Sequence, residues 1–221
     1  ILVFDGDKAQ LWDTDSNSLI KSFTTNMLHR YACFSPNEDQ LVCSDSSYFV
    51  TGMDVKKGYT IKHLDHRFVC SAVYSPNGKY IATASLTKSA KVWDVANDYS
   101  EAHTLIHGAA VNSVNFDLHN QYIVTASNDS TARVWDIQTG RPVTLPLKHN
   151  GVVTSASFSY DGNYIVTKCI VHDEKQEYIE NVRVWDVNNE NVVADFDINS
   201  YNKESINVYF DKSGDVILKD R

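Results

Sequence analysis

The stretch VNSVNFDLHNQYIVTASNDSTARVWDI, residues 111–137, decides the fold, because versions of it recur along the whole chain. Its closing Trp-Asp motif has counterparts in AQLWD, VTGMD, AKVWD and VRVWD. The five motifs end at Asp13, Asp54, Asp94, Asp136 and Asp186. The gaps between these aspartates are 41, 40, 42 and 50 residues. A regular period of about 40 residues is typical of repeat proteins, in which each unit buries its faces against its neighbours.

Each repeat carries the pattern of short antiparallel strands. Apolar and polar residues alternate up to a turn such as Ser-Pro or Asp-Gly, and a run of β-branched residues follows. Alternation with a period of two between turn residues is typical of strands. Gly78 and Gly162 fall where hairpin turns of this kind require a positive φ. Four strands in about 40–45 residues form the unit, called a blade, of a β-propeller.

The repeats resemble those of the WD-repeat family of β-propellers. The resemblance rests on Trp-Asp dipeptides in register at Trp12, Trp93, Trp135 and Trp185, with Met53 in place of tryptophan in the second repeat. It covers essentially the whole chain. It implies an all-β disc of four-stranded antiparallel blades, usually seven and sometimes eight. It also implies a platform that binds other proteins, usually without catalysis.

The repeats predict a single propeller domain over residues 1–221, with four complete blades and a partial blade at either end. The blades are expected at about residues 1–24, 31–64, 70–106, 111–148, 152–197 and 206–221. Seven blades of this size need roughly 280–320 residues, so the chain is expected to be part of a longer, seven-bladed protein. The alternative is a five-bladed ring in which the two partial blades complete each other.

Composition limits the partners. The chain has 28 acidic and 20 basic residues and a net charge of −8, which argues against binding nucleic acid or an anionic membrane by bulk charge. It contains no run of 18 apolar residues that would span a bilayer. Cys33, Cys43, Cys70 and Cys169 form no Cys-x-x-Cys pair, and each falls in a predicted strand. We therefore expect thiols in a reducing compartment, and a cytoplasmic or nuclear location.

The resemblance also implies a line of hydrogen-bonded side chains within a blade. The line joins a histidine before the first strand, a serine or threonine in the second, an aspartate in the next turn and the tryptophan of the third. We call this line the relay. The blade at residues 111–148 offers every member: His107, Thr125 or Ser127, Asp129 and Trp135.

The neighbouring blades match the relay less fully. His149 lies 36 residues before Trp185, which becomes 28, as in the preceding blade, once eight extra residues are removed. With Thr167 this blade keeps three members, but the extra residues leave no clear aspartate. In the blade at residues 70–106, Asp65 stands at the histidine position and Thr87 at the aspartate position, so only a partial network is expected there.

Catalytic, metal and cofactor sites are not predicted. Serine, histidine and aspartate could form a hydrolase triad, but there is no Gly-x-Ser-x-Gly motif. The indole N–H of a buried tryptophan needs an acceptor, which the relay supplies. His63, Asp65 and His66 are the densest group of potential metal ligands, but they lack the spacing of a metal site. No glycine-rich phosphate-binding loop precedes a helix.

Function is expected in the loops of one rim, called the top, where fourth-to-first and second-to-third strand loops meet in the family. At one position of the fourth-to-first loops the repeats hold Met27, Arg67, Ala109 and Gly151. Such variation suggests contact with solvent or a partner. His66, Arg67 and Phe68 form the group most like an interface hot spot, because arginine and aromatic residues dominate interface energetics.

The eight extra residues lie in CIVHDEKQEYIEN, between the second and third strands of the blade at 152–197. The ends of this segment alternate and the middle, 173–177, is charged, which predicts a longer hairpin with a solvated tip. His172, Tyr178 and Ile179 are candidate partner contacts. The alternative is a tolerated surface insertion without a partner.

An aromatic residue recurs at the end of each first strand, and we expect it to pack between adjacent sheets rather than to bind a ligand. The residues are Phe34, Tyr74, Phe116, Phe158 and Phe210.

The sequence thus predicts a non-catalytic scaffold that binds other proteins or peptides through the top-rim loops. One alternative is a regulatory or substrate-recognition propeller domain of a larger enzyme or enzyme complex. Another is a propeller that binds a small ligand in its central channel.

Overall fold

A computed structural model describes residues 1–5, 8–24, 32–44, 50–57, 60–172, 178–198 and 206–220. All of the regular structure in these ranges consists of β-strands, which form six antiparallel sheets. None of the described residues lies in a helix long and apolar enough to cross a membrane.

The first three sheets cover the N-terminal half. The first holds β1 (Leu2–Asp5), β2 (Lys8–Asp13) and β3 (Ser18–Thr24). The second holds β4 (Ala32–Phe34), β5 (Gln40–Ser44), β6 (Val50–Asp54) and β7 (Thr60–Leu64). The third holds β8 (Val69–Tyr74), β9 (Tyr80–Ser85), β10 (Ser89–Asp94) and β11 (Ser100–Ile106).

The other three sheets follow in the same order. The fourth holds β12 (Val111–Phe116), β13 (Tyr122–Ser127), β14 (Thr131–Asp136) and β15 (Leu147–Lys148). The fifth holds β16 (Val152–Phe158), β17 (Tyr164–His172), β18 (Tyr178–Asp186) and β19 (Val192–Ile198). The sixth holds β20 (Ile206–Phe210) and β21 (Val216–Asp220).

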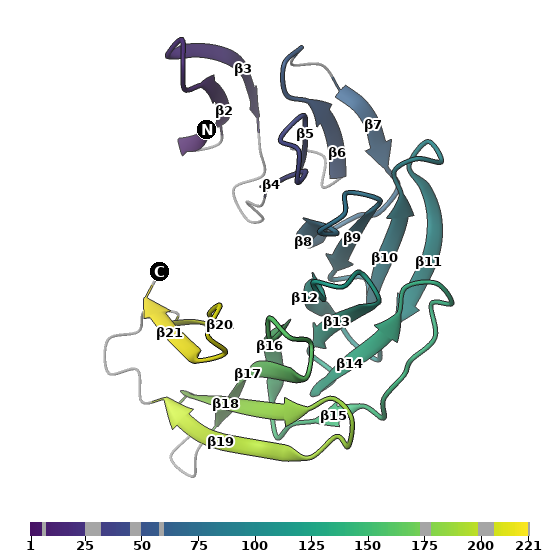
Figure 1. Cartoon of the computed structure of the whole chain (residues 1–221), viewed down its shortest axis with the longest axis vertical. Helices are drawn as coiled ribbons and strands as arrows, with labels where there is room; N and C mark the ends of the chain where they lie inside the picture. Colours follow the sequence, from purple (N-terminus) through teal and green to yellow (C-terminus); the bar gives the residue numbers. More distant parts are fainter. Residues whose placement is uncertain are drawn as a thin grey trace.

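The six sheets, numbered here as blades 1 to 6, stand side by side around a common centre (Figure 1). The first strands β8, β12 and β16 lie nearest the centre, and the fourth strands lie on the outside. Blades 1 and 6 face each other across an opening, so the blades form an open arc. The prediction of an all-β propeller with four-stranded blades is confirmed. The alternative of a ring closed by the two partial blades is wrong, because these blades do not meet.

The core lies between the sheets, so the middle strands are buried on both faces. Every residue of β13 after Tyr122 is buried. Ile123 packs in a cluster with Ala82 of β9, whereas the next residue, Val124, packs with Ile165 of β17. Full burial of such a side chain stabilises the fold by about 1.5–3 kcal/mol. Stacking of neighbouring blades therefore holds the arc together.

The turns after the first strands have the predicted geometry. Gly78 has a φ of 71° and Gly162 a φ of 75°, and the N–H of Gly78 donates to the carbonyl of Ser75 at 2.8 Å. Glu38 and Asn120 occupy the same turn position with φ values of 58° and 59°. These turns form the bottom rim, opposite the top rim.

The eight extra residues lengthen a hairpin, as the sequence predicts. β17 and β18 have nine residues each, against six in β13 and β14. Their register continues through Val171 opposite Ile179 to His172 opposite Tyr178. The predicted charged tip, 173–177, lies outside the described residues, as does Met27.

Candidate functional site

The relay of blade 4 is complete. The indole Nε1 of Trp135 donates to Thr125 Oγ1 at 2.8 Å, and His107 Nε2 lies 2.7 Å from the same oxygen. Because the hydroxyl accepts from the indole, its proton is directed to Nε2, which leaves Nδ1–H to donate to Asp129 Oδ2 at 2.9 Å. The structure thus selects Thr125, rather than Ser127, as the hydroxyl of the relay. Ser127 instead donates to the carbonyl of Ala110 at 2.9 Å.

Burial and charge set the ionisation of this blade's relay. Burial lowers the pKa of His107, and the Asp129 carboxylate opposes that effect. Burial also raises the pKa of Asp129, but hydrogen bonds from Thr131, the Gly108 N–H and His107 outweigh it and lower that pKa to about 2. The pair is therefore a neutral imidazole beside a carboxylate at neutral pH.

Blade 5 has a relay without an aspartate. Trp185 Nε1 donates to Thr167 Oγ1 at 2.9 Å, and His149 Nε2 lies 2.7 Å from that oxygen. His149 Nδ1 lies 3.0 Å from the carbonyl oxygen of Leu147. A carbonyl can only accept, so Nδ1 carries the proton, and the Leu147 carbonyl takes the place that Asp129 has in blade 4. Burial, followed by the nearby Arg183 charge, lowers the pKa of His149 to about 4.

Blade 3 also has a relay, through His66, which we expected to contact a partner. His66 is only 3% exposed. Its Nδ1 lies 2.7 Å from Thr83 Oγ1, and Nε2 lies 3.1 Å from Ser89 Oγ. Trp93 Nε1 donates to Thr83 Oγ1 at 3.0 Å. The prediction of His66 as an exposed contact is therefore wrong, and burial lowers its pKa to about 4.

A shorter loop explains that error. Two residues separate His66 from the start of its first strand at Val69, whereas three separate His107 from Val111. Counting back a fixed distance from the tryptophan therefore reaches Asp65 instead. The histidine position in blade 3 belongs to His66.

The relay is replaced in the first two blades. Cys43 occupies the threonine position of blade 2, and its Sγ lies 3.8 Å from Met53 Sδ. In blade 1, Trp12 Nε1 donates to Gln10 Oε1 at 3.2 Å. Burial raises the pKa of the Cys70 and Cys169 thiols to about 11, so these cysteines are protonated at neutral pH.

A second contact, which we did not predict from the sequence, holds the loop that enters each of blades 3, 4 and 5. A cation two positions before the tryptophan donates to the carbonyl of the residue that precedes the relay histidine. The pairs are Lys91 with Asp65 at 3.1 Å, Arg133 with Ile106 at 3.4 Å, and Arg183 with Lys148 at 3.0 Å. The repeated Lys or Arg before Val-Trp-Asp is the sequence signal that could have found it. The loops between these blades are thus anchored twice.

The top rim of blade 3 exposes an apolar and basic group. Arg67 and Phe68 are exposed, as predicted. The N–H of Leu86 donates to the carbonyl of Phe68 at 3.1 Å, which brings an exposed leucine beside the phenylalanine. Arg67, Phe68 and Leu86 form what we call the blade-3 rim patch.

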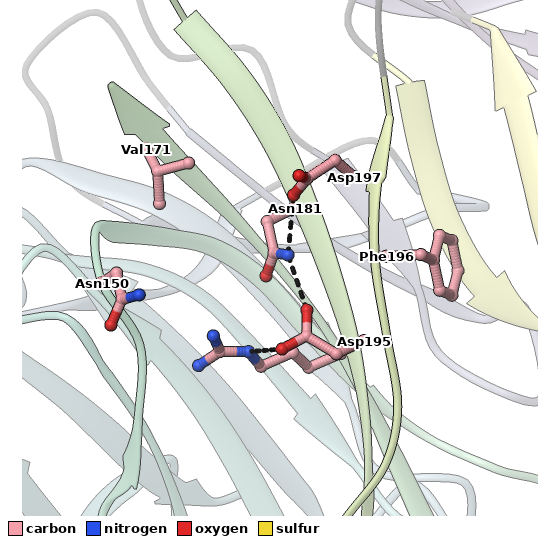
Figure 2. A pocket seen from close by; sticks show the side chains of 7 residues that line it. Asn150, Val171, Asn181, Asp195, Phe196 and Asp197 are labelled. Atoms are coloured by element: carbon pink, nitrogen blue, oxygen red, sulfur yellow. Dashed lines mark hydrogen bonds and ion pairs between the residues drawn. The ribbon is translucent and has the colours of Figure 1, made fainter. Parts of the chain in front are cut away.

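The top rim of blade 5 contains a polar groove at the base of the long hairpin (Figure 2). Asn181 Nδ2 donates to Asp195 Oδ1 at 2.7 Å and to Asp197 Oδ1 at 2.9 Å. Arg183 Nε donates to Asp195 Oδ2 at 2.9 Å. Phe196 points away from these carboxylates. This hairpin groove has a volume of about 420 Å³, with Asn150 and Val171 as its other lining residues.

The predicted hairpin contacts are placed only in part. Ile179 is half-buried opposite Val171. The side chains of His172 and Tyr178 lie outside the described residues. Gly151 differs from the other residues at its loop position for a structural reason, because an added Cβ would lie 1.9 Å from the carbonyl oxygen of Ile170.

Histidine, cysteine and acidic side chains form no group of three or more able to hold a metal ion within the described ranges. No protein of curated function matches the chain in sequence. Its fold is similar to a chain of hydrazine synthase from Kuenenia stuttgartiensis, with a TM-score of 0.70 and 17% identity. The alignment covers 83% of this chain and 52% of that chain, so this chain spans about half of its length. At this identity the likeness shows the fold alone.

The family model described as "WD domain, G-beta repeat" matches residues 57–94, 100–136 and 140–167. These matches fall on the blades where the tryptophan, threonine and histidine side chains are joined. The chain is a member of the WD-repeat family of β-propellers.

Proposed function

We propose that this protein is a non-catalytic scaffold that binds other proteins or peptides through its top rim. One observation carries the proposal. Blades 3, 4 and 5 repeat the same buried relay, whereas the rim above them differs from blade to blade. It presents the blade-3 rim patch on one blade and a lengthened hairpin with its groove on another.

The repeated interior supports the proposal because it lowers the cost of binding. Loops anchored twice, by the relay histidine and by the cation contact to the residue before it, lose little freedom when a partner binds. Affinity at a protein interface comes from a few anchors, commonly arginine and aromatic residues. Arg67 and Phe68 supply such anchors, and Asp195 and Asp197 offer carboxylates to a basic partner. The four cysteines are free thiols, which supports a reducing compartment, and we propose a cytoplasmic or nuclear location.

A double variant of the rim patch tests the proposal. Arg67→Ala with Phe68→Ala should reduce the capture of partners from cell extract, measured by quantitative mass spectrometry against the unaltered protein. The control is Lys79→Ala with Leu145→Ala, which changes one exposed cation and one exposed apolar side chain away from the top rim. Equal capture by all three proteins, at equal melting temperatures, would reject the rim patch as an interface.

A further inference from the structure

The aromatic residues that end the first strands do not all pack alike. Tyr74 packs between sheets as expected, with 7% of its surface exposed and its hydroxyl 3.4 Å from Gln40 Oε1. Phe116, Phe158 and Phe210 are only half-buried, and they line a cavity on the bottom rim. These three phenylalanines pack against buried clusters, as expected, and their exposed parts in addition line the cavity.

The cavity is a groove that crosses three consecutive blades. Beside the three phenylalanines it is lined by Leu118, Tyr160 and Tyr209, which are 44%, 57% and 39% exposed. We call these six residues the bottom groove. Its volume is about 310 Å³, at the lower end of the range of small-molecule pockets, roughly 300–1,000 Å³. That volume suits one large side chain better than a whole small molecule.

An unsatisfied hydroxyl points to a missing contact. Ser157 also lines the groove, and its Oγ is buried without a hydrogen-bond partner among the described residues. Burying a hydroxyl without a partner is unfavourable. A peptide group inserted beside Ser157 would supply the partner.

The charges around the groove favour a basic occupant. Asp211 lines it, and Asp161 follows Tyr160 in the adjoining turn. Hydrogen bonds, first from Ser213 to Asp211 and from Ser159 to Asp161, lower the pKa of both carboxyls, so they stay anionic. Lys212 is the cation of the lining, which leaves two carboxylates against one ammonium group. The chain's net charge of −8 also attracts a basic partner.

We propose that the bottom groove binds a peptide segment of a second protein, which inserts one large apolar or aromatic side chain flanked by lysine or arginine. Exposed clusters of large apolar residues mark such surfaces on proteins. The bottom groove lies at the opposite ends of the strands from the top rim. The protein can therefore hold two partners at once, one on each rim.

Labelled synthetic peptides test this directly. The probes are Gly-Ser-Lys-Ser-Trp-Ser-Lys-Ser-Gly, the same peptide with leucine or alanine at its centre, and the tryptophan peptide with glutamate in place of both lysines. Fluorescence anisotropy with the full chain should give tightest binding to the lysine-flanked tryptophan peptide, and weaker binding with a central alanine or glutamate flanks. Amide NMR shifts on titration should be largest around residues 116–118, 158–160 and 209–212.

Variants then locate the peptide. Leu118→Ser with Tyr160→Ser should weaken its binding about ten-fold or more, the effect of losing about 1.4 kcal/mol of contact. Leu145→Ser with Phe196→Ser removes an exposed leucine and an exposed aromatic outside the bottom groove and should leave binding unchanged. The rim-patch variant Arg67→Ala with Phe68→Ala should also bind normally, which separates this proposal from the top-rim interface.

Several outcomes would overturn the proposal. One is that no peptide binds, or that tryptophan and alanine peptides bind equally. Another is equal weakening by the groove variant and its control. A third is concentration-dependent self-association of the unaltered chain that Leu118→Ser with Tyr160→Ser abolishes, which would make the groove an interface between copies.

Discussion

The carbonyl oxygen of Ile170 lies directly against Gly151, only 1.9 Å from the position that a Cβ atom at residue 151 would take. This contact joins the loop entering blade 5 to the lengthened part of β17. The hairpin therefore requires glycine at position 151, and the loop that contains Gly151 packs against the hairpin. The two features that the sequence offers as separate partner sites form one packed unit.

Gly151→Ala should destabilise the protein by about 1–3 kcal/mol, the usual cost of overpacking, because a backbone carbonyl cannot move aside like a flexible side chain. Gly108→Ala is the matched control. It follows the relay histidine of blade 4, and its added Cβ would meet Asp129 at an ordinary 3.4 Å. Urea unfolding measures both. Equal free energies of unfolding for the two variants would contradict the close approach.

Thr125→Val should lower the free energy of unfolding by about 1–3 kcal/mol, although valine has nearly the same shape as threonine. The substitution leaves the indole N–H of Trp135 and Nε2 of His107 buried without their common partner. Thr60→Val, at an exposed position of β7, is the control and should change the free energy of unfolding by less than about 0.5 kcal/mol. If the two substitutions cost the same, the relay contributes nothing to stability.

Stability should fall as the pH drops from about 6.5 to 4. His66 and His149 have an ordinary pKa of 6.5 when unfolded and a folded pKa of about 4, chiefly because burial disfavours the imidazolium. Above pH 6.5 both histidines are neutral in the folded and in the unfolded chain, so the protein has its full stability. Below it the unfolded chain binds protons that the folded chain does not, so stability declines until the folded histidines are protonated near pH 4.

Each pKa unit corresponds to about 1.4 kcal/mol, so each histidine accounts for on the order of 3 kcal/mol across that window. Urea unfolding at a series of pH values measures the slope. His149→Gln should lower stability at pH 7 but flatten the decline between pH 6.5 and 4. A variant with the slope of the unaltered protein would show that His149 is not buried in its neutral form.

Much of the fold could be predicted because its determinants are local. The glycine of a hairpin turn, as at Gly162, and the alternation of a strand are read over a few residues. The tryptophan repeat then places each strand in its blade. In blade 4 the relay could also be predicted, since all its members are side chains at regular spacing.

The relays of blades 3 and 5 could be predicted only in part, for two physical reasons. The acceptor for His149 is the backbone carbonyl of Leu147, and a carbonyl has no residue type to recognise. His66 is displaced by a loop that lacks one residue, and loop length is not fixed by the strands that it joins. The exposure of Phe116 in the bottom groove depends on which residues of the neighbouring blades cover it. The sequence of a single repeat does not contain that information.

A further variant exchanges the β17–β18 hairpin for the turn of blade 4. Cys169 pairs with Val153 as Ser127 pairs with Val111, so Asn-Asp-Ser in place of residues 170–180 restores the blade-4 turn. The shorter loop itself changes the closure entropy by less than about 1 kcal/mol. The exchange also removes Glu180, a partner of the buried Lys168 at 3.1 Å, so the chain should stay folded but with a lower melting temperature. Partner capture should fall if the hairpin contributes to the top-rim interface. Unchanged capture would identify the hairpin as an insertion without a partner.

The same exchange should raise the pKa of His149, because the new aspartate would stand toward its imidazole as Asp129 stands toward His107. In blade 4 that carboxylate opposes the effect of burial. The matched control carries Asn-Ala-Ser, which has the same length and no carboxylate. NMR titration of the imidazole nitrogens should give a higher pKa for His149 with Asn-Asp-Ser than with Asn-Ala-Ser. Equal values would show that the shortened turn does not reach His149, and that the Leu147 carbonyl remains its partner.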